Sequence, residues 1–124
     1  MAGQRFSLLA RNWRPRKANH RLELDLVGRI DDEIIFVEVK TRTLDEASGK
    51  QPPILAQFSS TKKRNILRAA LLFISEHNLW ERPIRFDLVC VTFAANTNPS
   101  VEHYCNVIEF GKTLDSSDPT WQPW

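Results

Sequence analysis

The sequence predicts an α+β protein, in which a mixed β-sheet of about five strands carries one long helix packed on it. Apolar and alternating segments separated by turn residues predict the strands. A single segment with helical periodicity stands between the third and fourth strands, so it should form a crossover that joins parallel strands. With 124 residues, 42% of them hydrophobic and 26% charged, the chain has the size and composition of one globular domain.

The predicted elements follow the order β-β-β-α-β-β. The helix is predicted from apolar residues that recur at helical spacing between Ile66 and Ile74. We expect one domain over residues 1–110, followed by a flexible tail over 111–124. The tail contains Asp115–Pro119, which is a polar stretch without periodicity. The expected strands cover 6–13, 22–27, 34–40, 85–93 and 101–110, and the expected helix covers 61–77.

The second and third strands form the most informative part of the chain. A turn centred between Asp31 and Asp32 places Asp25 opposite Glu38, with the two Cβ atoms roughly 5 Å apart. The same register places Glu23 opposite Lys40. Two opposed carboxylates repel each other. A divalent cation such as Mg²⁺ between them would make their interaction favourable. The alternative is an ordinary solvated hairpin with scattered charges.

The net charge of +2 conceals an uneven distribution. Residues 1–68 contain 14 basic and 8 acidic residues, whereas residues 69–124 contain 3 basic and 7 acidic residues. A basic half of this kind is a candidate surface for nucleic-acid phosphate, or simply a solvated edge. Lys62, Lys63 and Arg64 open the predicted helix, where cations oppose the helix dipole, so we expect a compensating anion or a solvated face.

The composition also limits the other function classes. No apolar run approaches the roughly 20 residues of a membrane span, and no signal-peptide core follows the N-terminus. The two cysteines, Cys90 and Cys105, are expected to be buried free thiols, which favours a cytoplasmic location. His20, His77 and His103 are far apart and show no metal-ligand spacing.

The arrangement of an Asp, a Glu-x-Lys on the next strand, a helix and a further strand resembles the PD-(D/E)XK nuclease superfamily. It is most similar to the YraN-like family of small bacterial proteins. The resemblance covers residues 6–110, and its most specific part is Val37–Arg42. The other segments that carry it are Leu9–Arg14, Glu23–Leu26, Lys62–Arg64 and Arg85–Asp87.

The resemblance implies a restriction-endonuclease-like fold in which Asp25, Glu38 and Lys40 occupy the catalytic positions. Glu23 matches an acidic residue that usually follows a glycine, whereas Leu22 stands before it here. The family usually has a helix with a further Glu before the first strand. Only about five residues precede Phe6, so that helix is expected to be missing.

Together these observations predict a Mg²⁺-dependent (or Mn²⁺-dependent) nuclease-like protein that acts on the phosphodiesters of nucleic acid, with DNA preferred. Asp25 and Glu38 would hold the metal, Glu23 would be a further ligand or an outer partner, and Lys40 would stabilise developing charge. The alternative is a non-catalytic nucleic-acid-binding module, and the sequence leaves homodimerisation open. The residues predicted to contact phosphates are Arg14, Arg42, Lys62, Lys63 and Arg64.

Overall fold

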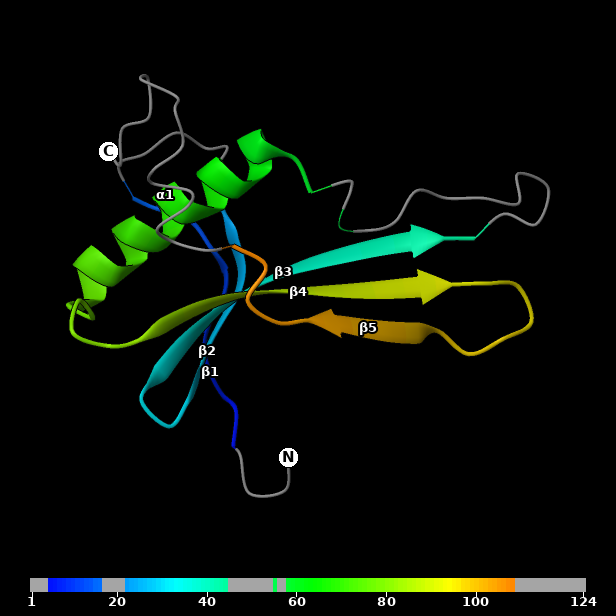
Figure 1. Ribbon diagram of the computed structural model, residues 1–124, viewed down its shortest axis with the longest axis horizontal. Coiled ribbons are helices and arrows are strands. Elements are labelled where there is room, and N and C mark those ends of the chain that lie inside the picture. The colour runs from blue at the N-terminus through cyan, green and yellow to red at the C-terminus, as the bar shows by residue number, and fades with distance from the viewer. Residues whose placement is uncertain (1–4, 17–21, 45–54, 56–57, 109–124) are drawn as a thin grey trace.

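The computed structural model describes residues 5–16, 22–44, 55 and 58–108. Five strands form a single mixed sheet in the order β1-β2-β3-β4-β5, and one helix, α1, lies across one face of it (Figure 1). This confirms the predicted α+β class and the restriction-endonuclease-like arrangement. The elements are β1 (Ser7–Trp13), β2 (Leu24–Ile30), β3 (Glu33–Thr43), α1 (Ser60–His77), β4 (Ile84–Phe93) and β5 (Ser100–Tyr104).

The β2–β3 hairpin has the predicted register. Asp31 and Asp32 form the turn, and Asp31 adopts the left-handed conformation with φ of 53°, which Asp tolerates better than most residues. The ladder runs from the Ile30–Glu33 pair to the Leu26–Val37 pair. Asp25 and Glu38 follow directly beyond the last pair of this ladder, Leu26–Val37.

α1 connects two parallel strands, as the sequence predicts. β3 and β4 pair in parallel over ten residue pairs, from Ile34–Ile84 to Thr43–Phe93. β5 pairs antiparallel with β4. The last parts of β3 and β4, together with β5, form a three-stranded extension that projects beyond the N-terminal end of α1 (Figure 1).

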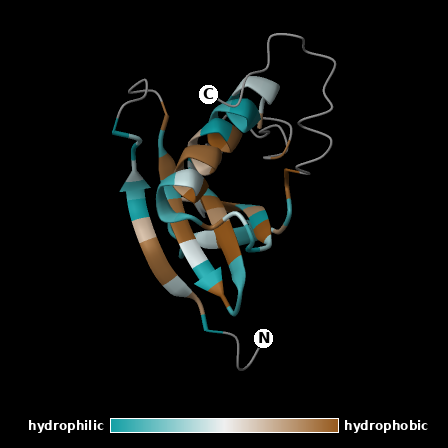
Figure 2. Ribbon diagram, turned by 90° about the vertical axis from the view of Figure 1, so that its left-hand side faces the viewer, coloured by the Kyte–Doolittle hydropathy of each residue, from teal (hydrophilic) through white to brown (hydrophobic). Residues whose placement is uncertain are grey.

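The main core lies between α1 and the sheet, where hydrophobic residues gather on both elements (Figure 2). Phe73 of α1 makes edge-on ring contacts with Trp13 of β1 and Phe36 of β3, at centroid distances of 5.1 and 5.9 Å. Phe36 in turn stacks on Phe86 of β4 at 5.3 Å. Because side chains alternate along a strand, the residues between these core positions point to the opposite face of the sheet.

Both ends of α1 have recognisable caps. The Ser59 hydroxyl accepts a hydrogen bond from the backbone N–H of Lys62 at 3.1 Å, and Asn78 ends the helix in the left-handed conformation. α1 is the one α-helix of the described segments, and it is not long and apolar enough to cross a membrane.

Two expectations about the C-terminal part were wrong. β5 ends at Tyr104 instead of continuing through the predicted 101–110, because the chain turns away to bond the Val107 N–H to the Phe86 carbonyl. Cys105, just past the strand end, is exposed and not buried, whereas Cys90 is a buried free thiol as expected. The predicted flexible tail, 111–124, lies outside the described residues.

Candidate functional site

The predicted carboxylates Asp25 and Glu38 face one cavity between the β2–β3 hairpin and the first turns of α1. The cavity has a volume of about 240 Å³. Its lining combines acidic groups from the hairpin with polar and basic groups from the helix. The described lining residues are Glu23, Asp25, Glu38, Lys62, Asn65 and Ile66.

Among the described residues, each of the two carboxylates also contacts a donor group. The Asp25 Oδ2 atom accepts a hydrogen bond from the backbone N–H of Val39 at 2.9 Å, which fixes the carboxylate across the hairpin. The Glu38 Oε1 atom lies 3.2 Å from the Lys62 Nζ atom, and the Glu38 side chain is only 13% exposed. Lys62 therefore closes one wall of the cavity.

The electrostatics of this cavity oppose ionisation of Glu38. Burial and the nearby negative charge of Asp25 raise the pKa of Glu38 above its ordinary value of 4.5, and Lys62 only partly offsets them. One ammonium group thus faces two carboxylates. The cavity has an excess of negative charge that an added cation would relieve.

Glu23 contributes to the same cavity from just before β2, but its main partner differs from the predicted one. Its Oε2 atom forms an ion pair with the Arg14 Nη2 atom at 3.2 Å. The β2–β3 ladder stops at the Leu26–Val37 pair, so the predicted opposition of Glu23 and Lys40 falls beyond it. Arg14, predicted to contact phosphate, thus pairs with Glu23, and its side chain is exposed.

Lys40 and Arg42 lie further along β3, where the three-stranded extension begins. Lys40 is half-buried and follows Glu38 by two residues, so it projects from the same face of the strand, although the described residues lining the cavity do not include it. Arg42 donates from Nε to the Thr92 Oγ1 atom at 3.1 Å and pairs with Glu102 at 3.5 Å. Arg42 is therefore placed towards β5, away from the carboxylate cavity.

The first turn of α1 has no acidic residue, although it carries consecutive basic ones. The compensation expected for the helix dipole comes partly from the protein itself, because Lys62 pairs with Glu38. The Lys63 Nζ atom lies 5.6 Å from the centroid of the Phe58 ring, a cation–π contact. Arg64 is half-buried in the same turn.

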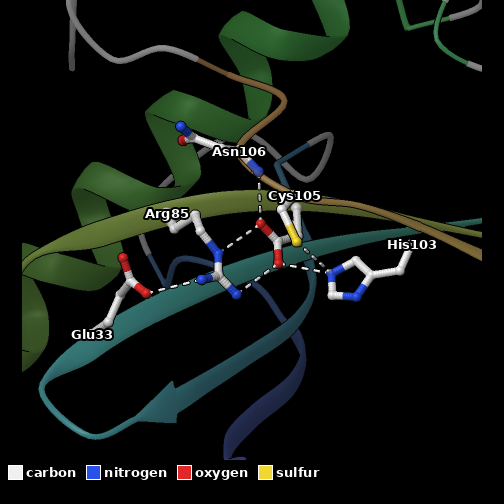
Figure 3. A network of polar contacts seen from close by, with 6 residues as sticks. Glu33, Arg85, His103, Cys105 and Asn106 are labelled. Carbon is white, nitrogen blue, oxygen red and sulfur yellow. Dashed lines mark hydrogen bonds and ion pairs between the residues drawn. The ribbon is translucent and has the colours of Figure 1, made fainter. Parts of the chain in front are cut away.

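A second polar cluster lies on the face of the sheet opposite α1 and is centred on Asp87 of β4 (Figure 3). The carboxylate of Asp87 is fully buried and has four donors at 2.8–3.0 Å. Arg85 donates twice, and the Arg85 Nη1 atom also pairs with Glu33 at 3.0 Å. The remaining two donors are the backbone N–H of Asn106 and the Nε2 atom of His103.

These contacts set the ionisation of Asp87. Burial alone would raise the pKa of Asp87, but the hydrogen bonds from Arg85, from the Asn106 N–H and from His103 outweigh it. The pKa of Asp87 is therefore held below its ordinary value of 3.8. Asp87 is an ionised, fully bonded carboxylate.

This cluster was not predicted from the sequence, because His103 lies far along the chain from the other histidines. The structure brings His103 together with Asp87 and Cys105, and one ligand atom from each lies within 4.8 Å of the others. The signal in the sequence was the His-x-Cys spacing of residues 103–105 beside a strand with a buried acid. Residues two apart on an extended chain share a face.

The mixed five-stranded sheet with one helix defines the class: a small α+β protein whose arrangement is consistent with the restriction-endonuclease-like fold. Residues 1–91 match the family described as "Uncharacterised protein family UPF0102". The chain belongs to this family, which is the YraN-like group named by the sequence motifs.

The relatives of this chain carry the same family name. A UPF0102 protein of Lawsonia intracellularis is 39% identical over 119 residues, which cover 96% of this chain and 83% of the relative. A UPF0102 protein of Nitratidesulfovibrio vulgaris is 39% identical over 117 residues, covering 94% and 81%. One from Geobacter metallireducens is 37% identical over 105 residues, covering 85% and 79%. The similarity thus extends over most of each protein.

Proposed function

We propose that this protein is a metal-dependent, nuclease-like protein that acts on nucleic-acid phosphodiesters, with DNA as the preferred substrate. The observation that carries the proposal is the pair Asp25 and Glu38, which face one cavity with one ammonium group between hairpin and helix. A pair of partly buried carboxylates costs free energy in the fold unless a cation joins it. Such a cost is typical of functional sites.

The donor set fits Mg²⁺ or Mn²⁺. These ions prefer oxygen ligands and are usually bound through one or two carboxylates, with waters and substrate phosphates completing the shell. Asp25 and Glu38 would hold the ion, and Glu23 is near enough to the cavity to bind one of its waters. When bound, the ion would supply Lewis acidity towards the scissile phosphate and lower the pKa of a coordinated water.

The chain's own residues have distinct tasks in this proposal. The backbone N–H of Val39 holds one Asp25 oxygen and so aims the other into the cavity. Lys40 offers an ammonium group on the Glu38 side of β3, where it would stabilise negative charge that develops on the phosphate. Lys62 pairs with Glu38 at the cavity and would also be placed to contact a substrate phosphate.

Lys63 and Arg64 would contact backbone phosphates without reading sequence. Their replacement by Gln should weaken binding to every DNA sequence and reduce the slope of log affinity against log salt by about one per residue. Arg82→Gln is the matched control, because Arg82 pairs with Asp32 at the hairpin turn. That turn lies roughly 20 Å from Glu38 along the strand.

The direct test is cleavage of single-stranded, duplex and branched DNA by the purified protein in Mg²⁺, in Mn²⁺ and in EDTA. We expect cleavage of at least one substrate with metal, none in EDTA, and none by Asp25→Asn. Cleavage that persists unchanged in Asp25→Asn would overturn the proposed site.

The alternative function, a binding module without catalysis, is favoured by the Glu38–Lys62 ion pair, which satisfies part of the cavity's charge without a metal. Calorimetric titration of Mg²⁺ or Mn²⁺ with and without DNA separates the two. The nuclease-like proposal requires metal binding that Asp25→Asn abolishes. DNA binding with no metal uptake under either condition would establish the binding module instead.

A further inference from the structure

The cluster on the other face of the sheet has a different chemistry, which the proposed function does not use. Asp87 supplies a buried carboxylate from β4, whereas His103 of β5 and Cys105 beyond it are exposed. The His103 Nε2 atom lies 2.8 Å from the Asp87 Oδ2 atom and 3.7 Å from the Cys105 Sγ atom. Figure 3 shows the His103 ring and the Cys105 sulfur converging on the carboxylate held by Arg85 and Asn106.

This geometry does not fit nucleophilic catalysis by the thiol. A Cys-His-Asp relay uses both ring nitrogens, one facing the thiol and the other facing the carboxylate. Here a single nitrogen, Nε2 of His103, faces both Asp87 and Cys105. A carboxylate oxygen, an imidazole nitrogen and a sulfur that converge on one point are instead suited to a shared ion.

We propose that Asp87, His103 and Cys105 bind a divalent cation of the zinc type. Thiolate, imidazole and carboxylate are the ligands that Zn²⁺ takes in proteins, and a thiolate disfavours Mg²⁺. Metal–ligand lengths of about 2.0–2.3 Å set neighbouring ligand atoms of a tetrahedral zinc roughly 3.3–3.7 Å apart. The Nε2–Sγ distance already matches, and the Nε2–Oδ2 distance needs to open by roughly half an ångström.

The surrounding charges balance such an ion. Glu33, Arg85 and Asp87 together carry one net negative charge. The Cys105 thiolate adds a second negative charge, and a divalent cation neutralises the two. On binding, the thiol proton passes to the buffer, and His103 presents its Nε2 lone pair while its proton sits on Nδ1. Arg85 continues to hold Asp87, which is the role of an outer-shell partner that orients a ligand.

The site is also accessible and has room for a further ligand. The side chains of His103 and Cys105 are exposed, so solvent reaches the point on which the three ligand atoms converge. Three protein ligands and one open position are the arrangement in which zinc retains a water or takes up a small anion.

The test is titration of the reduced, metal-free full chain with Co²⁺, in excess Mg²⁺ so that oxygen-only sites are occupied. We expect one equivalent to give a thiolate-to-cobalt charge-transfer band and tetrahedral visible bands, both lost on adding Zn²⁺. Cys105→Ser should remove the charge-transfer band and weaken Zn²⁺ binding by more than about tenfold, and His103→Asn should weaken it similarly.

Cys90→Ala is the matched control, because it removes the only other cysteine, which is buried in the core. We expect it to bind Co²⁺ like the parent, with circular dichroism showing that each variant is folded. Absence of a thiolate–cobalt band in the parent would overturn the proposal, and so would unchanged Zn²⁺ affinity in folded Cys105→Ser.

Discussion

The two faces of one sheet carry buried carboxylates whose ionisation is shifted in opposite directions. On the face that packs on α1, Glu38 stands beside Asp25, and burial with this like charge raises the pKa of Glu38. On the other face, Asp87 is more completely buried, yet its pKa is lowered. Burial alone therefore does not decide whether the pKa of a carboxyl group is raised or lowered in this fold.

The difference lies in the partners. Asp87 receives four hydrogen bonds, two of them from a guanidinium, and no carboxylate faces it directly among the contacts of the described residues. Asp25 and Glu38 share a cavity with a single ammonium, that of Lys62. One face holds a carboxylate that stabilises the fold, and the other holds a pair of like charges that costs stability.

The largest effect should appear in activity. Under the proposed function, Lys40→Ala should lower DNA cleavage by roughly 100-fold or more, because removing one group that stabilises developing charge typically costs this much. DNA affinity should change little, since binding rests on many phosphate contacts. The measurements are single-turnover cleavage and salt-dependent binding, with Asp32→Asn at the exposed hairpin turn as the control. Cleavage at the parent rate would remove Lys40 from the site.

The next effect is a matched pair of stability changes, measured by urea unfolding in EDTA. Asp87→Asn should lower the free energy of unfolding by about 3 kcal/mol. It removes the buried charge that pairs with Arg85, which keeps Glu33 as a partner, and it points a new amide N–H at the donors that bonded Asp87. Asp25→Asn should be at least as stable as the parent, because the amide oxygen still accepts from Val39 while the repulsion with Glu38 disappears. Equal losses in both variants would contradict the contrast between the faces.

Much of the fold follows from the sequence. So does one side of the contrast between the two faces, the one formed by Asp25 and Glu38. Alternating apolar residues and a two-residue turn at Asp31–Asp32 fix the hairpin register, since a one-residue slip would turn the core positions outwards. That register alone places Asp25 opposite Glu38. The parallel pairing of β3 and β4 follows from the helix between them.

The rest depends on how separate elements meet in space. Lys62 is part of a basic helix start, and the sequence does not reveal that it reaches Glu38, because the spacing of residues along α1 does not place the helix on the sheet. The Asp87 cluster needs the pairing of β4 with β5 and the turn of the chain after Tyr104. Both are long-range features without a local sequence pattern.

A smaller effect on stability distinguishes the charge of Asp25 from its role as hydrogen-bond acceptor for the Val39 N–H. Asp25→Ala removes the acceptor for the Val39 N–H as well as the charge, whereas Asp25→Asn removes only the charge. Asp25→Ala should therefore be less stable than Asp25→Asn by about 1 kcal/mol, the usual contribution of one hydrogen bond. Urea unfolding of both variants in EDTA measures the difference. Identical stabilities would mean that the Val39 contact does not hold the carboxylate in place.

The smallest effect is a pH dependence, and its sign distinguishes the two faces. Because the pKa of Glu38 in the fold is raised above 4.5, the folded state binds more protons than the unfolded state between 4.5 and that raised value. Stability contributed by Glu38 is therefore lost as the pH rises through this window. Asp87, whose pKa is lowered, acts in the opposite sense, and its contribution is lost only as the pH falls below 3.8.

Glu38→Gln isolates the first contribution. Its stability relative to the parent should increase as the pH rises from 4 to 7, because the parent alone incurs the cost of ionising beside Asp25. Urea unfolding in EDTA across this range measures the difference, and Glu76→Gln, at an exposed position of α1, corrects for the loss of one charge. A difference that stays flat, or that falls with rising pH, would mean that Lys62 fully compensates Glu38, and the cavity would then have no excess negative charge to attract a cation.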